Sequence, residues 1–184
     1  MMETKPDGRF YSRILRKAKA IVQIIPKDRE MTLGELAKQI NKNNLPEFYL
    51  KRFNRSMSEV RIKDYIRYLQ NIKVLDSHED KLISTFQERE TDREWAQAMS
   101  DRALEHLAEI LKKRPDEIPD LLDDCRNRLL DSHRIPKLDT IIRHFEIEGG
   151  RSQELFRWSL HLYADGPTCP FDIRHFPVLS ITIK

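Results

Sequence analysis

Residues 31–40 read Met-Thr-Leu-Gly-Glu-Leu-Ala-Lys-Gln-Ile and carry the clearest helix signal in the chain. The hydroxyl of Thr32 can accept a hydrogen bond from a free N–H group in the first turn of a helix. Glu35, three residues later, can reach back to the backbone of Thr32. This spacing is a capping box, so a helix is predicted to begin directly after Thr32. Its buried face is formed by apolar residues at helical spacing, namely Leu33, Leu36, Ala37 and Ile40.

Amphipathic helices are predicted on both sides of this segment. Residues 10–25 repeat apolar side chains every three or four positions, and Pro26 ends the pattern. A third helix is predicted after Ser58, a suitable N-cap residue, with an apolar face made of Ile62, Tyr65, Ile66, Leu69 and Ile72. Directly after this helix, two short apolar stretches flank the polar turn 76–80, which predicts a β-hairpin over residues 74–86.

Helix, capped helix, third helix and hairpin follow one another as they do in the winged helix-turn-helix superfamily, which residues 8–86 resemble. The resemblance is one of pattern, carried by residues 32–40, by the apolar positions of the third helix and by the hairpin. It implies a third helix that enters the major groove of DNA. Residues 45–55 depart from the family pattern, because the turn before the third helix usually has only a few residues. A short extra helix or an ordered loop is expected there.

The C-terminal half opens with a second capping box. Thr91 and Glu94 have the required spacing and precede a helix that ends near Pro115. Pro119 suits the first turn of the next helix, and residues 138–145 predict a shorter one. Three helices are therefore expected between residue 91 and residue 145.

The last elements are predicted to be strands. Apolar and polar residues alternate over 156–162, and this strand is expected to pair with a final strand at 178–183 in a small C-terminal hairpin. This order is also compatible with a second, degenerate winged helix. The predicted fold class is α+β, mainly α, with a winged-helix domain at 1–88 and a helical domain with C-terminal strands at 89–184.

Charge is distributed unevenly between the halves. Residues 1–86 carry 18 basic and 11 acidic side chains, a net charge of +7, whereas residues 87–184 carry 15 and 19, a net charge of −4. A basic half with a groove-reading pattern favours a polyanionic partner, although a solvated basic surface without a partner would look the same. The acidic half is expected to contact a protein partner or to form a homodimer.

The third helix and the residues before it supply most of the candidate DNA contacts. The face opposite the apolar stripe is centred on Asp64, Arg67 and Asn71, where Arg67 suits a guanine edge and Asn71 an adenine. Lys63 and Tyr68 flank this face. The other predicted contacts, mainly to phosphate, are Arg16, Lys17, Lys51, Arg52, Arg55, Ser58, Arg61 and Lys81.

Two features favour other interpretations of these residues. Every surface helix has a polar face, so Arg67 and Asn71 also fit a solvated helix without a ligand. The predicted hairpin turn, Ser77-His78-Glu79-Asp80, is acidic where a winged helix normally contributes a cation. This turn therefore suggests contact with a protein, or a phosphate contact through Lys81 alone.

Enzymatic chemistry has little support in the sequence; the polar cluster Asp172-Ile173-Arg174-His175 could serve a nuclease, but no other metal-nuclease residues accompany it, so an ordered loop is expected there. Among five glycines only Gly149 and Gly150 are adjacent, and no Lys-Ser or Lys-Thr follows them as in a phosphate-binding loop. Cys125 lies on an apolar stripe, which predicts a core residue. No metal-ligand spacing occurs among Cys125, Cys169, His133, His144, His161 and His175. The protein is therefore predicted not to be an enzyme, with no catalytic residue, metal or cofactor.

Two functions remain in view. The first is a double-stranded DNA-binding protein, either a transcriptional regulator or the DNA-recognition subunit of a larger complex. The second is a winged-helix adaptor that joins the subunits of a multiprotein complex. No apolar run approaches the ~20 residues that cross a bilayer, and residues 1–10 show no signal-peptide pattern. A cytoplasmic, nucleoid-associated protein without a membrane partner is therefore expected.

Overall fold

The structure is a computed structural model that describes residues 12–25, 30–78, 81–84, 89, 91–133 and 138–169. Within these ranges it contains seven α-helices and two small antiparallel sheets. The predicted class, α+β with mainly helical content, is therefore confirmed.

The N-terminal helices and the hairpin after them follow the predicted order, and one short strand that was not predicted precedes the second helix. These elements are α1 (Arg13–Ile24), the unpredicted strand β1 (Met31–Thr32), α2 (Leu33–Lys42), α3 (Glu59–Asn71), β4 (Leu75–His78) and β5 (Lys81–Ser84). The strands form one sheet in the order β1-β5-β4, in which Leu82 of β5 lies opposite Met31 on one side and Ser77 on the other. The predicted hairpin is therefore present, and its tip at 79–80 lies outside the described residues.

Capping hydrogen bonds set where the helices begin. The Thr32 hydroxyl accepts from the backbone N–H of Glu35 at 3.2 Å, and the Glu35 carboxylate accepts from the backbone N–H of Thr32 at 2.9 Å. Thr91 and Glu94 make the same reciprocal pair at 3.2 and 3.0 Å. Ser58 caps α3 by accepting from the N–H of Arg61 at 3.3 Å. All three caps predicted from sequence are confirmed.

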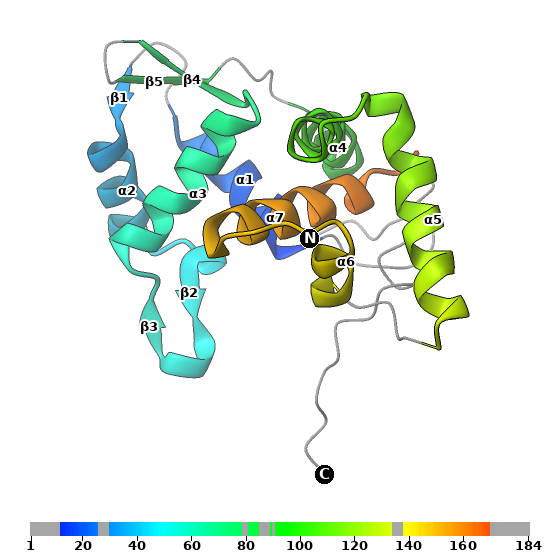
Figure 1. The fold of residues 1–184 in the computed structure, drawn as a ribbon. Coiled ribbons are helices and arrows are strands. Elements are labelled where there is room, and N and C mark those ends of the chain that lie inside the picture. The colour runs from blue at the N-terminus through cyan, green and yellow to red at the C-terminus, as the bar shows by residue number, and fades with distance from the viewer. Residues whose placement is uncertain are drawn as a thin grey trace.

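Residues 46–56, where a short extra helix or an ordered loop was expected, contain two short 3-10 helices and also a small β-hairpin that was not predicted. These elements are η1 (Pro46–Phe48), β2 (Tyr49–Leu50), η2 (Lys51–Phe53) and β3 (Arg55–Ser56). Tyr49 lies opposite Ser56, and Leu50 lies opposite Arg55. The hairpin extends away from the helices that carry it (Figure 1).

Helices also make up the described C-terminal half. They are α4 (Asp92–Leu111), η3 (Pro115–Glu117), α5 (Ile118–Asp131), α6 (Leu138–His144) and α7 (Gly150–Asp165). The predicted strand at 156–162 is wrong, because these residues belong to α7. Helix α7 has a polar stripe, since Glu154, Arg157 and His161 all line one cleft, but buried Ser159 falls between Arg157 and His161 in the sequence and gives residues 156–162 the alternation of a strand.

Two further predictions depended on that strand. The C-terminal hairpin is wrong because its first strand is α7, and its second strand at 178–183 lies outside the described residues. A second winged helix would need a strand after α6, and the chain forms α7 there instead.

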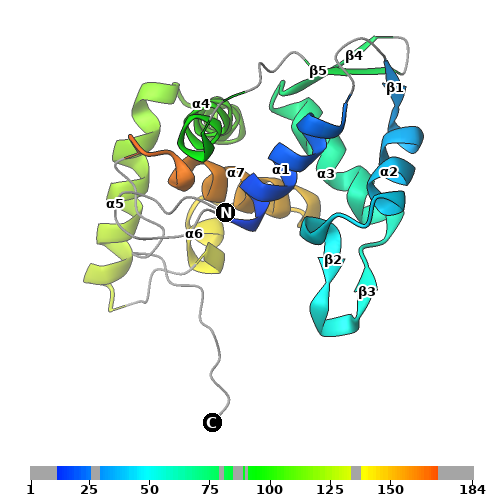
Figure 2. The ribbon, with the colours of Figure 1, turned by 180° about the vertical axis from the view of Figure 1, so that it is seen from behind.

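Helix α7 packs against both halves of the chain. It lies between the α1–α2–α3 group and α4–α5 (Figures 1 and 2) and contacts α4 along much of its length. The indole of Trp158 stacks on the ring of Tyr65 in α3 with centroids 4.6 Å apart, and the hydroxyls of Ser159 and Tyr68 are 2.8 Å apart. A single hydrophobic core therefore runs from α1 to α7 across residue 88.

Candidate functional site

The helix predicted to read DNA, α3, is covered on one side by α7. The Arg61 guanidinium pairs with Glu154 of α7 and lies 5.2 Å from the centre of the Trp158 ring. Tyr68, predicted at the edge of the solvent face, is buried against α7, so that prediction is wrong. Arg61 and Tyr68 both belong to the interface between α3 and α7.

The other cations predicted on α3 and the β4–β5 hairpin already have partners. Arg67 and Asn71 are exposed as predicted, and Lys63 is half-buried. Each of three cations lies near a carboxylate of the same chain: Lys63 with Glu59 at 3.3 Å, Arg67 with Asp64 at 3.7 Å and Lys81 with Glu30 at 3.7 Å. Such surface pairs add little to stability, but they reduce the positive potential available to a polyanion.

A second group of cations lies on α1 and the β2–β3 hairpin, and we name it the α1–hairpin surface. Its members are Arg13, Arg16, Lys17, Lys51, Arg52 and Arg55. Among the described residues, no carboxylate forms an ion pair with any of them. All but Lys17 are exposed. Sequence reasoning named five of these residues as phosphate contacts and missed Arg13, which stands one turn before Lys17 on α1.

The tip of the β2–β3 hairpin carries an aromatic ring between two cations. Phe53 is 60% exposed, and the guanidinium carbons of Arg52 and Arg55 lie 5.8 and 5.4 Å from its ring centre. Asn54 takes the left-handed conformation with φ 47°, which turns the chain, and its side-chain oxygen accepts a hydrogen bond from the Tyr49 hydroxyl. The tip is therefore a shaped, basic protrusion.

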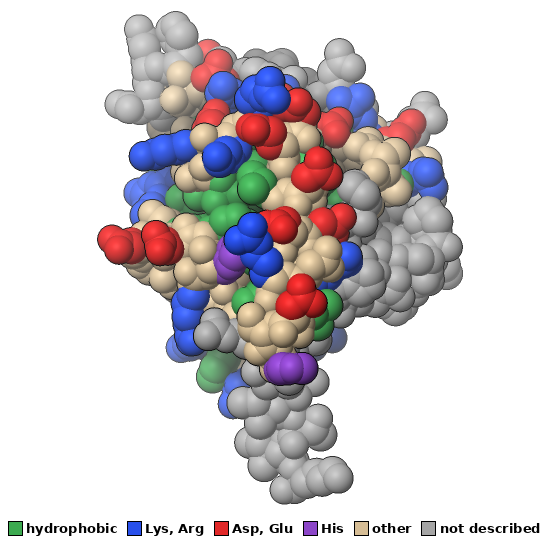
Figure 3. All heavy atoms as spheres, turned by 45° about the vertical axis from the view of Figure 1, so that its right-hand side comes forward, with side chains coloured by type: hydrophobic (Ala, Val, Ile, Leu, Met, Phe, Trp, Pro, Cys, Tyr) green, Lys and Arg blue, Asp and Glu red, His purple; other side chains and the backbone are tan. Residues whose placement is uncertain are grey.

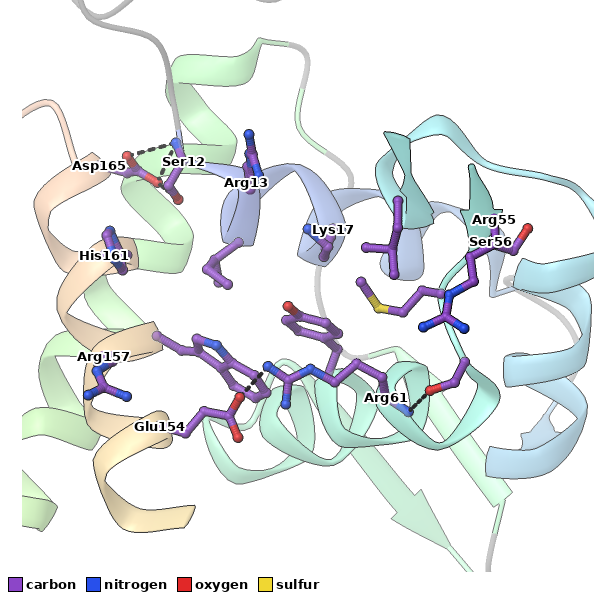
Figure 4. A pocket seen from close by; sticks show the side chains of 16 residues that line it. Ser12, Arg13, Lys17, Arg55, Ser56, Arg61, Glu154, Arg157, His161 and Asp165 are labelled. Carbon is purple, nitrogen blue, oxygen red and sulfur yellow. Dashed lines mark hydrogen bonds and ion pairs between the residues drawn. The ribbon is translucent and has the colours of Figure 1, made fainter. Parts of the chain in front are cut away.

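A cleft of about 1010 Å³ opens between α1, the β2–β3 hairpin, α3 and α7. Figure 4 shows Lys17 extending from α1, Arg55 from the hairpin, Arg61 from α3 and His161 from α7 around this space. The Lys17 ammonium lies 5.4 Å from the centre of the Tyr65 ring. The hairpin that the sequence did not predict thus forms one wall of the cleft.

The electrostatics of the cleft are most unusual at Lys17. This side chain was predicted to contact phosphate, yet Lys17 is only 8% exposed, because α3 and the hairpin cover it. Burial, as the largest cause, and the positive charges of Arg13, Arg16 and Arg61 together lower the pKa of Lys17 from 10.5 to about 8. Burial also lowers the pKa of His161 below its ordinary value.

We expect Lys17→Met to stabilise the protein. The folded state holds a Lys17 ammonium that burial disfavours, so removing it should raise the free energy of unfolding at pH 7 by about 2 kcal/mol. Because the folded pKa lies below the unfolded value, wild-type stability should rise with pH between about 8 and 10.5, and the difference from the variant should shrink there.

Denaturant unfolding of both proteins at pH 7, 9 and 10 would measure this difference. Lys38→Met is the matched control, since Lys38 is exposed on α2, and its effect should stay below about 0.5 kcal/mol. A Lys17→Met protein that is less stable than wild type at pH 7 would contradict the expectation.

The opposite side of the molecule has a different character. Figure 3 shows acidic side chains interspersed with basic ones over the face that contains α4 and α5. Two cations of α5 pair with its own carboxylates, Arg126 with Asp123 at 3.3 Å and Arg128 with Asp124 at 2.9 Å. This face is less suited to a polyanion than the α1–hairpin surface.

The buried cysteine, the possible metal ligands and the length of the helices also bear on which kind of site the described residues could form. Cys125 is fully buried in α5, as predicted for a core residue. Within the described part of the chain, no cluster of three His, Cys, Asp or Glu side chains could hold a metal ion. None of the described helices is long and apolar enough to cross a membrane.

No protein-family model matches the sequence, and no match was found among curated proteins or solved structures.

Proposed function

We propose that this protein binds double-stranded DNA and that it does so through the α1–hairpin surface. The observation that carries the proposal is the separation of the cations into two groups. Lys63, Arg67 and Lys81 each lie within 4 Å of a carboxylate, although Asp64 beside Arg67 also serves Arg61 and Arg151. The cations of the α1–hairpin surface have no carboxylate partner among the described residues. Phosphate contacts supply most of the affinity of proteins for DNA, so the uncompensated group is the better DNA-binding surface.

The shape of the β2–β3 hairpin supports this placement. A two-stranded ribbon fits the major groove, and the tip offers Arg52 and Asn54 as hydrogen-bonding side chains next to exposed Phe53. Arg13 and Arg16 of α1 lie beside the hairpin, where they would meet phosphates of the backbone. In this arrangement the β2–β3 hairpin reads the groove, and α3 supports it.

The proposed scaffold is a winged helix-turn-helix. The order α1-β1-α2-α3-β4-β5 and the sheet order β1-β5-β4 support this assignment, as does the capping box that begins α2. The β2–β3 hairpin is then an insertion between the second and third helices. A protein of this kind would serve as a transcriptional regulator or as the DNA-recognition subunit of a larger complex.

The dependence of DNA binding on salt tests the proposal. Five exposed cations that contact phosphate should give a plot of log K against log salt concentration with a slope of about −4 to −5. Titration of a fluorescent duplex at several salt concentrations would measure the slope. A weak interaction with a flat salt dependence would contradict DNA binding through this surface.

A protein-interaction adaptor is the second candidate function. It is favoured by the internal ion pairs of α3, which leave that helix with a nearly neutral exposed face, and by Leu130, which is 51% exposed on acidic α5. An adaptor that binds its partner through apolar contacts would show little salt dependence. The same titrations, made with DNA and with a candidate partner, therefore separate the two functions.

A further inference from the structure

The inner part of the cleft is a compartment distinct from the exposed hairpin tip. Its floor is Lys17 of α1 above the ring of Tyr65, and its far wall is α7, with Trp158 and His161 (Figure 4). Arg55 reaches in from the hairpin, and Arg13 stands at the α1 side. Four segments of the chain therefore line one open cleft.

Several charges of this compartment are already compensated. The guanidinium of Arg61 pairs with Glu154, and that of Arg157 lies 2.5 Å from Asp139. Asp165 is occupied by α1, since both of its carboxylate oxygens accept from the backbone N–H of Ser12 at 3.1 Å. Arg13, Lys17 and Arg55 are left without a carboxylate partner among the described residues.

From this arrangement we infer that the cleft binds a phosphate monoester between Lys17, Arg13 and Arg55. A monoester carries two negative charges near pH 8 and three terminal oxygens, and the cleft is lined by three cations without a carboxylate partner among the described residues, two from α1 and one from the hairpin. A phosphodiester inside a DNA strand offers one charge, and the duplex on both sides of it would keep it from the floor of the cleft. The ligand is therefore a free nucleotide or the terminal phosphate of a strand.

This inference goes beyond the proposed function. Only binding of a strand's terminal phosphate rests on the proposed DNA binding. Binding of a free nucleotide requires no DNA contact at all. If the ligand is a free nucleotide, the site would make the α1–hairpin surface responsive to a small molecule, because Arg13 and Arg55 belong to both.

Proton uptake provides a signature that a purely structural lysine would not show. With a pKa of about 8, Lys17 is about half protonated at pH 8, and a bound dianion beside it would favour the ammonium. Binding should therefore take up about half a proton per ligand at that pH. The charged and titratable groups that face Lys17 or share its cleft are Arg13, Arg16, Glu47, Arg55, Arg61, Tyr65, Glu154, Arg157, His161 and Asp165.

Calorimetric titration of the full chain at pH 8 tests the inference, in two buffers with different ionisation enthalpies. Adenosine 5′-monophosphate and inorganic phosphate should bind with proton uptake, and adenosine should not bind. Lys17→Met should weaken binding at least tenfold and abolish the proton uptake, whereas Lys38→Met should behave as wild type. A thermal unfolding scan of each variant confirms that it is folded.

Three results would overturn the inference. The first is that adenosine binds as tightly as its monophosphate, and the second is that Lys17→Met binds phosphate as well as wild type does. The third is that neither the phosphate probes nor a phosphorylated strand end binds. Arg55→Gln gives an independent check at the hairpin wall, and it too should weaken phosphate binding.

Duplexes with 5′-phosphate and 5′-hydroxyl ends distinguish the two sources. Tighter binding of the phosphorylated ends identifies a strand terminus as the ligand, and equal binding combined with nucleotide binding identifies a free nucleotide. DNA binding with a steep salt slope but no phosphate-monoester binding would refute this inference alone. Nucleotide binding without DNA binding would refute the proposed function alone.

Discussion

Replacing Trp158 with alanine should lower the free energy of unfolding by about 3–5 kcal/mol, the usual cost of removing a large buried aromatic side chain. Trp158 is 6% exposed, and its ring lies 4.6 Å from that of Tyr65 and 5.2 Å from that of Tyr68. Its removal would leave a cavity between α7 and α3, where the two halves of the chain meet. Urea unfolding followed by far-ultraviolet circular dichroism would give the free energy.

Leu130→Ala is the control for this measurement, because Leu130 is apolar but half exposed on α5, and its loss should cost below about 0.5 kcal/mol. The result also tests the predicted division at residue 88. If Trp158→Ala cost less than about 1 kcal/mol, or if wild type unfolded in two separate transitions, residues 1–88 and 89–184 would be independent domains.

The largest expected effect on DNA binding comes from removing three cations of the α1–hairpin surface together. The variant Arg16→Gln, Lys51→Gln, Arg52→Gln should bind a duplex about 100-fold more weakly near 0.15 M salt, because about three phosphate contacts are lost. Its salt slope should become shallower by about three units. Fluorescence anisotropy titrations at several salt concentrations would measure both quantities.

The matched control removes the same amount of charge elsewhere. The variant Lys63→Gln, Arg67→Gln, Lys81→Gln takes away three cations that pair with Glu59, Asp64 and Glu30, so its affinity for DNA should fall less than about tenfold. Equal losses in both variants would mean that affinity follows net charge alone. A larger loss of affinity in the control variant would mean that DNA binds at α3 and the β4–β5 hairpin instead.

Local signals predicted the first half of the fold well. The capping boxes at Thr32 and Thr91 depend on residues three positions apart, and such short-range hydrogen bonds are visible in the sequence. Helix α7 was missed because buried Ser159 lies between Arg157 and His161 of its polar stripe, and the three together imitate the alternation of a strand. The β2–β3 hairpin was missed because its strands have only two residues each.

The candidate site was less predictable than the fold, because pairing of charges is a long-range property. Sequence reasoning identified Arg61 and Arg67 as cations on α3, but nothing near them in the sequence indicates that Glu154 of α7 neutralises Arg61. The burial of Lys17 has the same origin, since the hairpin that covers it was not predicted. Residue type and helical phase thus located the cations, but only the tertiary packing showed which of them lack a carboxylate partner and could bind a polyanion.

The contact between Ser12 and Asp165 has a consequence for folding during synthesis on the ribosome. Ser12, the N-terminal cap of α1, interacts with a carboxylate 153 residues later in the sequence. Likewise, Tyr68 contacts Ser159 and Tyr65 contacts Trp158, and both of these partners belong to α7. During synthesis the ribosome releases α1, α2 and α3 long before α7. Until α7 emerges, the nascent chain exposes the apolar surface of Tyr65 and Tyr68, which makes it a candidate client for chaperones that bind such surfaces.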